Sequence, residues 1–248
     1  MKRLLIIPAA GMGMRLQSSV PKVLYPVGGR PALDYLLDLY EAVVDHTVLV
    51  LHPSFEPAVR RCVAGRVRQP EIVFQDPPSG MLPAMLLPRQ RVATYEPAQV
   101  WVTWCDQVAV HPRTVERLAA LSEGDPPAAC TFPTVWKENP YIHFLRDEQG
   151  TITSVLQRRE GDQLPPHGES DSGLFCFSRE AYVELLAEFS ATAPSGAHTG
   201  EANFLPFIPW VARRRSVRTF LLEHEMESVG INTLDDVRQV EGYLRERE

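Results

Sequence analysis

The sequence predicts an α/β fold with a mixed, mainly parallel central sheet that is flanked by helices. In the first half, short apolar segments alternate with amphipathic helical patterns, which is typical of repeated β-α-β units with right-handed crossovers. Polar residues and glycines follow directly after several apolar segments. Because ligands bind at the carboxyl ends of the strands in such sheets, these residues are the first candidates for a site.

The first half supplies the predicted parallel strands and the helices that connect them. Apolar runs predict strands at 4–7, 47–51, 72–74 and 100–104. Helical patterns predict helices at 32–43, 56–64, from 82 to at least 87, and 113–121. In the first helix Leu33, Leu36, Leu37 and Tyr40 share one face at 3.6-residue spacing, which predicts a buried side.

The second half changes character and predicts an antiparallel extension of the sheet. Short strands with turn residues between them are expected at 128–132, 141–145, 152–156 and 174–177. A helix at 179–189, a polar mobile loop at 190–203, a helix at 204–213 and a strand at 217–222 follow. Thr233 opens the last helix, with Asp236 as its capping partner. No linker divides the chain, so residues 1–248 are expected to form one domain.

Composition excludes several classes of protein. The 248 residues carry a net charge of −6, which argues against a general nucleic-acid binder with a basic face. No run of about 18 apolar residues predicts a transmembrane helix, and the N-terminal apolar run is too short for a signal peptide. Four scattered cysteines suggest buried free thiols rather than zinc ligands or disulfides. We therefore expect a cytoplasmic protein with no membrane or nucleic-acid partner.

The segment 8–24, PAAGMGMRLQSSVPKVL, has the chemistry of a phosphate-binding turn. Gly11 and Gly13 let the backbone turn and approach a ligand closely. Exposed backbone N–H groups form an anion site, and the cations Arg15 and Lys22 can neutralise phosphate charge. Neither the P-loop pattern nor the dinucleotide fingerprint is complete here, so the residues alone leave the ligand open.

Three further polar residues stand at positions that suit ligands. Asp106 follows the strand at 100–104 and could bind Mg²⁺ together with substrate phosphates, or could simply cap a turn. Gln75 follows the strand at 72–74 and can pair with both donors and acceptors of a base, or can belong to an ordinary loop. Asn232 precedes the last helix, where turn residues are also common.

The pattern A-A-G-x-G-x-R-L-x(4)-P-K-V-L, which begins at Ala9 and Ala10, resembles the signature of sugar-1-phosphate nucleotidylyltransferases. It is most similar to the N-terminal uridylyltransferase domain of the bacterial N-acetylglucosamine-1-phosphate uridyltransferases. The resemblance implies a Rossmann-like, glycosyltransferase-A-like sheet whose antiparallel extension covers a sugar site. It extends to the last helix, where Gly230-Ile231-Asn232-Thr233 matches a family motif. No acetyltransferase half follows, so we expect a monofunctional enzyme.

The resemblance also implies roles for the residues at the nucleotide. Asp106 and Asn232 would hold Mg²⁺, although this chain has Cys-Asp-Gln-Val where the family usually has Gly-Asp-x-Pro. Arg15 and Lys22 would be the catalytic cations. Gln75 and Gly80 would recognise uracil or thymine, which favours UTP and then dTTP. The implied nucleotide-binding residues are Ala9, Ala10, Gly11, Gly13, Arg15, Lys22, Gln75, Gly80 and Asp106.

The implied acceptor pocket departs furthest from the family. Tyr141 and His143 stand where the family carries Tyr-Gly-Arg, Gln157 replaces a glutamate, and Asp171 replaces an asparagine. Arg159 occupies the place of a lysine near the sugar phosphate. A pocket that changes its polar groups changes its ligand, because unpaired buried polar groups are costly. We therefore do not expect N-acetylglucosamine 1-phosphate to carry over as the acceptor.

The implied reaction joins an NTP to a sugar 1-phosphate and releases pyrophosphate. The acceptor oxygen is already anionic, so catalysis needs positioning and charge neutralisation rather than a Ser, Cys or His nucleophile. Three alternatives stay open: a cytidylyltransferase acting on a polyol or similar phosphate, a molybdopterin-type guanylyltransferase, and a non-catalytic nucleotide-sugar sensor. The Gly-Ile-Asn-Thr motif counts against the guanylyltransferase, and the retained Lys22 and Asp106 count against the sensor.

Overall fold

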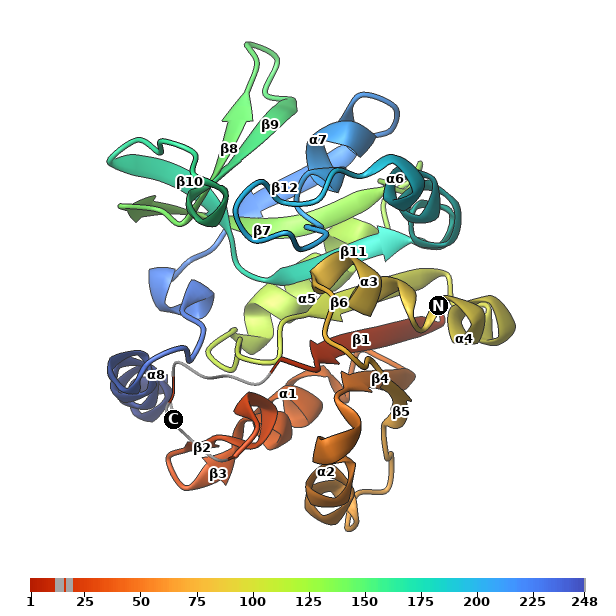
Figure 1. The fold of residues 1–248 in the computed structure, drawn as a ribbon, viewed down its shortest axis with the longest axis vertical. Helices are drawn as coiled ribbons and strands as arrows, with labels where there is room; N and C mark the ends of the chain where they lie inside the picture. The colour runs from red at the N-terminus through yellow and green to blue at the C-terminus, as the bar shows by residue number, and fades with distance from the viewer. Residues whose placement is uncertain (12–15, 17–19, 248) are drawn as a thin grey trace.

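The computed structural model describes residues 1–11, 16 and 20–247 of the chain. Its centre is an eight-stranded sheet in the order β10-β7-β11-β6-β1-β4-β5, with β12 paired to β7 (Figure 1). Neighbouring strands β6, β1, β4 and β5 are parallel. Strand β11 runs antiparallel to both β6 and β7. The mixed, mainly parallel arrangement confirms the predicted fold class.

The strands of this sheet come from both halves of the chain. The parallel group is β1 (Arg3–Ala9), β4 (His46–Leu51), β5 (Glu71–Phe74) and β6 (Gln99–Thr103). The other group is β7 (Cys130–Glu138), β10 (His167–Asp171), β11 (Leu174–Ser178) and β12 (Val217–Leu221). Ile6 pairs with Val48 on one side and Val102 on the other, so β1 lies in the buried middle of the sheet.

Helices cover both faces of the sheet, because alternate residues of each strand point to opposite sides. Leu5 and Ile7 face one core, and Leu4 and Ile6 face the other. The first core includes residues of α1 (Ala32–Tyr40), α2 (Glu56–Val63), α5 (Pro112–Ser122) and α8 (Leu234–Arg247). The second includes residues of α3 (Met81–Leu86), α4 (Arg89–Tyr95), α6 (Leu186–Thr192) and α7 (Phe207–Ala212).

The antiparallel half differs from the sequence prediction in its detail. Strands β8 (Ile142–Arg146) and β9 (Ile152–Gln157) form a separate hairpin sheet instead of extending the central one. Strand β10 was not predicted, because its sequence HGESD is polar and resembles a turn. The expected helix at 179–189 is a π-helix, η5 (Ala181–Leu185), continued by α6. The helix expected at 204–213 is shorter, because residues 204–206 precede α7.

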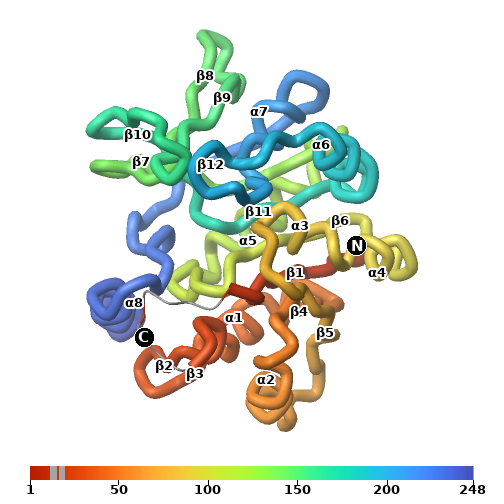
Figure 2. The backbone as a smooth tube through the Cα atoms, in the orientation of Figure 1, coloured from red at the N-terminus to blue at the C-terminus, as the bar shows by residue number. Residues whose placement is uncertain are grey.

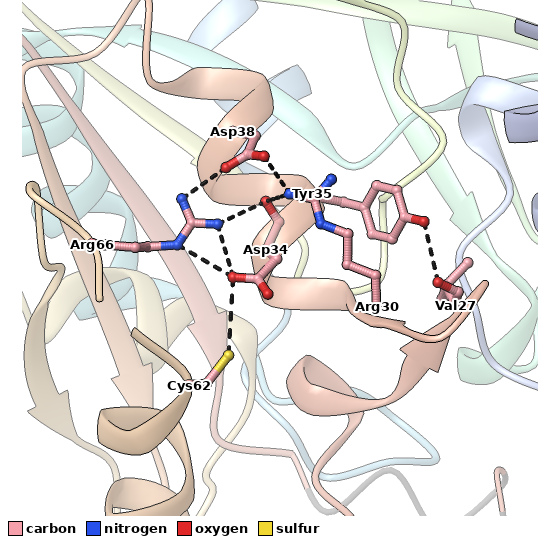
Figure 3. A network of polar contacts seen from close by, with 7 residues as sticks. All are labelled: Val27, Arg30, Asp34, Tyr35, Asp38, Cys62 and Arg66. Carbon is pink, nitrogen blue, oxygen red and sulfur yellow. Dashed lines mark hydrogen bonds and ion pairs between the residues drawn. The ribbon is translucent and has the colours of Figure 1, made fainter. Parts of the chain in front are cut away.

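A network of ion pairs fixes the α1 side of the molecule (Figure 3). Arg66, just beyond α2, donates to Asp34 at 2.8 Å and to Asp38 at 2.7 Å, and both aspartates belong to α1. Arg30 also pairs with Asp38, and Tyr35 donates to the carbonyl oxygen of Val27 at 3.1 Å. The network therefore ties α1 both to the segment after α2 and to the short hairpin of β2 (Pro26–Val27) and β3 (Arg30–Pro31).

The last helix returns to the start of the chain. Figure 2 shows α8 beside the β2–β3 hairpin. There the backbone N–H of Gly28 donates to Glu241 of α8 at 2.7 Å. This contact brings the segment before α8 next to the segment that follows the glycine turn. Within the part of the chain that the structure describes, no helix is both long and apolar enough to cross a membrane.

We expect Phe175→Ala to lower the free energy of unfolding by about 3–5 kcal/mol, as is usual for deletion of a buried ring. Phe175 is fully buried and packs against four other aromatic rings: Trp104, Phe132, Phe177 and Phe204. Urea unfolding measures the change. Val67→Ala is the control, because Val67 is 99% exposed and its truncation should change little. Equal midpoints for the two variants would contradict this account of the core.

Candidate functional site

Three residues that are distant in the sequence meet at the carboxyl edge of the parallel strands. Lys22 lies in η2 (Lys22–Leu24), Asp106 follows β6, and Asn232 precedes α8. The Nζ atom of Lys22 lies 2.8 Å from Oδ2 of Asp106 and 2.8 Å from Oδ1 of Asn232. The side chains of Lys22 and Asp106 are only 16% and 13% exposed. A cation is therefore held between two oxygen ligands in a mostly dry environment.

Backbone contacts hold the two oxygen ligands in place. The N–H of Ile231 donates to the carbonyl oxygen of Asp106 at 3.1 Å. A Cβ atom at Gly230 would lie 2.9 Å from the Asp106 carboxylate, so only glycine allows this close approach. The N-terminus of the last helix is capped as predicted: Asp236 accepts from the N–H of Thr233 at 2.7 Å, and Thr233 accepts from the N–H of Asp236 at 3.2 Å.

The donor set at this point suits a hard divalent cation. A carboxylate and an amide oxygen can hold Mg²⁺ when substrate phosphates complete its coordination. The described residues contain no group of three His, Cys, Asp or Glu side chains placed to hold a metal alone. Burial, together with the charge of Asp106, raises the pKa of the Cys105 thiol to about 12. This neighbouring cysteine therefore stays protonated and is a poor metal ligand.

The glycine turn is described only in part. Ala9 and Ala10, at the end of β1, are buried, and Gly11 is exposed. An added Cβ at Gly11 would meet no atom of the described residues within 4 Å. Gly13 and Arg15 lie outside the described residues, so their predicted contacts with phosphates stay predictions.

The two residues predicted to recognise the base lie in one loop after β5. Gln75 is 6% exposed, and its amide Nε2 lies 3.2 Å from both the carbonyl oxygen of Gly80 and the hydroxyl of Ser79. Gly80 has a φ of +110°, a conformation that favours glycine. Gln75 therefore braces the loop that presents Gly80 at the start of α3.

A cavity of about 540 Å³ lies beside the cation pocket. Four of the five predicted acceptor residues line it: Tyr141, Gln157, Arg159 and Asp171. Asp106 and Asn232 line it too, so the cavity and the cation pocket are continuous. His143 does not line it. Its Nδ1 accepts from the backbone N–H of Glu169 at 2.9 Å, and the structure thus places this ring against β10.

Sequence reasoning missed two polar residues in the cavity wall. Lys137, at the end of β7, donates to the carbonyl oxygen of Ser228 at 3.2 Å. Burial lowers the pKa of its ammonium, which Asp171, Glu225 and Asp236 partly offset. Gln107 is 7% exposed, and its Oε1 has no hydrogen-bond partner among the described residues. The sequence gives no sign of either residue, because a lysine or a glutamine indicates a binding site only when the direction of its side chain is known.

Asp171, which lines the same cavity as Lys137, is also affected by burial. Burial raises the pKa of the Asp171 carboxyl, while the N–H of Gly173 and the charge of Lys137 lower it. The Gly173 N–H lies 2.9 Å from Asp171 Oδ2. A half-buried carboxylate and a half-buried ammonium therefore both line this cavity.

Comparison with known proteins assigns the family. Residues 5–193 match the model of the MobA-like NTP transferase domain, so the chain belongs to this family. This confirms the resemblance to nucleotidyltransferases. The chain is 29% identical to the bifunctional protein GlmU of Heliobacterium modesticaldum, with 99% of the chain and 53% of that protein covered. The identity to GlmU of Syntrophomonas wolfei is 26%, covering 100% and 54%. The chain thus spans about half the length of these relatives.

We expect Gly230→Ala to weaken divalent-cation binding, because the added Cβ would force the Asp106 carboxylate away from Asn232. A displaced metal ligand should lower affinity by about 10–100-fold. Titration with Mn²⁺, followed by electron paramagnetic resonance, measures it. Gly242→Ala in α8 is the matched control, because an added Cβ there meets no atom within 4 Å. Unchanged Mn²⁺ affinity in Gly230→Ala would contradict the assigned cation site.

Proposed function

We propose that this protein is a Mg²⁺-dependent nucleotidylyltransferase that transfers UMP, or next dTMP, from an NTP to a sugar 1-phosphate. The products are an NDP-sugar and pyrophosphate. The observation that carries the proposal is the meeting of Lys22, Asp106 and Asn232 beside the 540 Å³ cavity, which Asp106 and Asn232 also line. Membership of the NTP transferase family supports the nucleotide half of the reaction. The resemblance of the sequence motifs to sugar-1-phosphate nucleotidylyltransferases supports a sugar 1-phosphate as the acceptor.

The chemistry needs little covalent help from the protein. An oxygen of the acceptor phosphate attacks the α-phosphorus of the NTP, and the bond from that phosphorus to the leaving pyrophosphate breaks. Mg²⁺, held by Asp106 and Asn232, would neutralise phosphate charge. Lys22 would move its ammonium from these two oxygens to the α-phosphate, where negative charge has to be stabilised. Arg15 and the amides of the glycine turn would hold the outer phosphates.

In the proposal, the base of the NTP and the acceptor lie on opposite sides of Lys22, Asp106 and Asn232. The loop that contains Gln75 and Gly80 would recognise the pyrimidine. Tyr141, Gln157, Arg159 and Asp171 would contact the acceptor, and Lys137 joins them on the evidence of its position in the cavity wall. His143 is the weakest member of the predicted acceptor set, because its ring is turned to the backbone of β10.

A pyrophosphate-release screen that crosses five NTPs with a panel of sugar 1-phosphates tests the proposal. We expect Mg²⁺-dependent release with UTP or dTTP and at least one sugar 1-phosphate, and none when either substrate is omitted. Release with CTP and a polyol phosphate would instead identify a cytidylyltransferase. The absence of release with every combination would contradict transfer and favour a nucleotide-sugar sensor.

We expect Lys22→Ala to lower kcat by roughly 10²–10³-fold, as for loss of a group that stabilises transition-state charge. The side chain of Lys22 donates to Asp106 and Asn232, so urea unfolding of the same variant checks that the fold survives the loss of this mostly buried ion pair. Steady-state kinetics with the best substrate pair of the screen measures kcat. Lys2→Ala, at the far end of β1, should keep the full rate. Wild-type turnover in Lys22→Ala would remove Lys22 from the mechanism.

A further inference from the structure

The segment 195–203 lies between the two ends of the proposed substrate site. It is compact: the N–H of Gly196 donates to the carbonyl oxygen of Glu201 at 2.8 Å, and Ser195 forms a β-bridge with Ala202. Asn203, at its end, lines the cavity, as do the next two residues. The sequence predicted only a mobile loop here, since small polar residues gave no sign of what holds the segment in place.

One carboxylate, that of Glu160, gathers the polar groups of this segment. It accepts from the hydroxyl of Thr199 at 2.6 Å, from Nδ2 of Asn203 at 2.8 Å and from the backbone N–H of His198 at 3.0 Å. Glu160 ends η4 (Arg158–Glu160), which directly follows β9 and the acceptor-side residue Gln157. Hydrogen bonds to an ionised acceptor are about twice as strong as neutral ones.

The backbone around these contacts is shaped for close approach. A Cβ at Gly196 would lie 2.5 Å from the Glu160 carboxylate. A Cβ at Gly161 would lie 2.4 Å from the ring of His198, and Gly161 also has a φ of +88°, which disfavours other residues. Glycines on both sides of the contact therefore allow η4 and segment 195–203 to pack directly together.

The other side of the segment contacts the base-side loop. The N–H of Leu82 donates to the carbonyl oxygen of Ala202 at 3.2 Å. A Cβ at Gly80 would lie 3.0 Å from that same oxygen. Segment 195–203 thus touches the Gly80 loop on one side and η4 on the other, so it forms a wall that both substrate ends share.

We propose that Glu160 is a positioning residue that fixes this shared wall, and through it sets the placement of the acceptor relative to the nucleotide. The proposal rests on the proposed function for the identity of the two substrates, but the contact between Glu160 and segment 195–203 does not. Glu160 acts through Thr199, His198 and Asn203. Glu160 and its neighbour Arg159 in η4 also line the cavity.

The side chain of Glu160 is ionised at neutral pH. Hydrogen bonds from Thr199 and Asn203 are the largest causes that lower its pKa, to about 2. The stabilisation is present above the pKa of an ordinary glutamate and is lost only as the pH falls towards 2. The contact is therefore a constant feature of the site at neutral pH and does not switch there.

Amide hydrogen exchange of the full chain without ligands tests the contact itself. Glu160→Gln keeps the size of the side chain but removes the charge and turns an NH₂ group towards donors. We expect exchange at His198 and Thr199 to rise about tenfold or more, as for loss of hydrogen bonds to a charged group. Glu148→Gln, an exposed glutamate in the β8–β9 turn, is the matched control and should leave exchange unchanged. Unchanged exchange in Glu160→Gln would overturn the contact.

Kinetics of the same variants tests the positioning role. With the best substrate pair of the screen, Glu160→Gln should raise KM for the acceptor about tenfold, with a smaller change for the NTP. Thr199→Val should give part of this effect, and the double variant should be no worse than Glu160→Gln, because both changes break one contact. Faster exchange with an unaltered acceptor KM would overturn positioning. Absence of turnover in the wild type would contradict the proposed function alone, since exchange needs no substrate.

Discussion

The ion pair between Lys22 and Asp106, shared with the amide oxygen of Asn232, is the constraint on which the arrangement of the site depends. Largely buried charges are costly unless each is paired. The pairing therefore requires η2, the end of β6 and the segment before α8 to meet at one point, although 84 and 210 residues separate Lys22 from its two partners. The α8 contact with the β2–β3 hairpin and the lack of a side chain at Gly230 both serve this convergence.

The oxygens of Asp106 and Asn232, which accept from the Lys22 ammonium, favour a positive charge between them. A divalent cation that enters competes with the Lys22 ammonium for the same two ligands. A displaced ammonium has to find another anion, because it cannot stay unpaired in a mostly dry site. The α-phosphate of a nucleotide is the anion that our proposed reaction supplies next to this pocket. In that proposal, the ion pair that organises this pocket becomes the source of the catalytic charge.

The sequence was sufficient where the signal is local. The parallel strands are short buried apolar runs, and the edge at which Gln75 and Asp106 lie follows from strand direction alone. The resemblance, not periodicity, assigned Lys22, Asp106 and Asn232 to one site, because nothing local ties residue 22 to residue 106 or residue 232. The direct contact of Lys22 with Asp106 was not predicted. The roles of Gly13 and Arg15 rest on sequence, since the structure does not describe them.

The acceptor side was harder to predict, because its walls are built by tertiary contacts. Strand β10 is polar and shows no apolar alternation, so its position beside β7 depends on pairing that no short window reveals. The β8–β9 hairpin has an ordinary strand pattern, but that pattern does not say which sheet it joins. The orientations of Lys137 and His143 follow from the positions of β10 and of the β8–β9 hairpin. They could not be predicted from the sequence for the same reason.

The two proposed halves of the site are built on different parts of the sheet. Two of the segments proposed to bind phosphate, the glycine turn and Asp106, follow β1 and β6, which pair in the middle of the sheet. The proposed acceptor wall includes residues of β7, β9 and the segment held by Glu160. Its cavity-lining residues Lys137, Gln157 and Asn203 are polar, although Phe132 of β7 and Phe204 beside Asn203 belong to the second core. Substitution of these polar residues can change the ligand without removing the buried apolar contacts of the same elements. In our proposal, one phosphate-binding centre can therefore serve different acceptors when the polar residues of the cavity wall change.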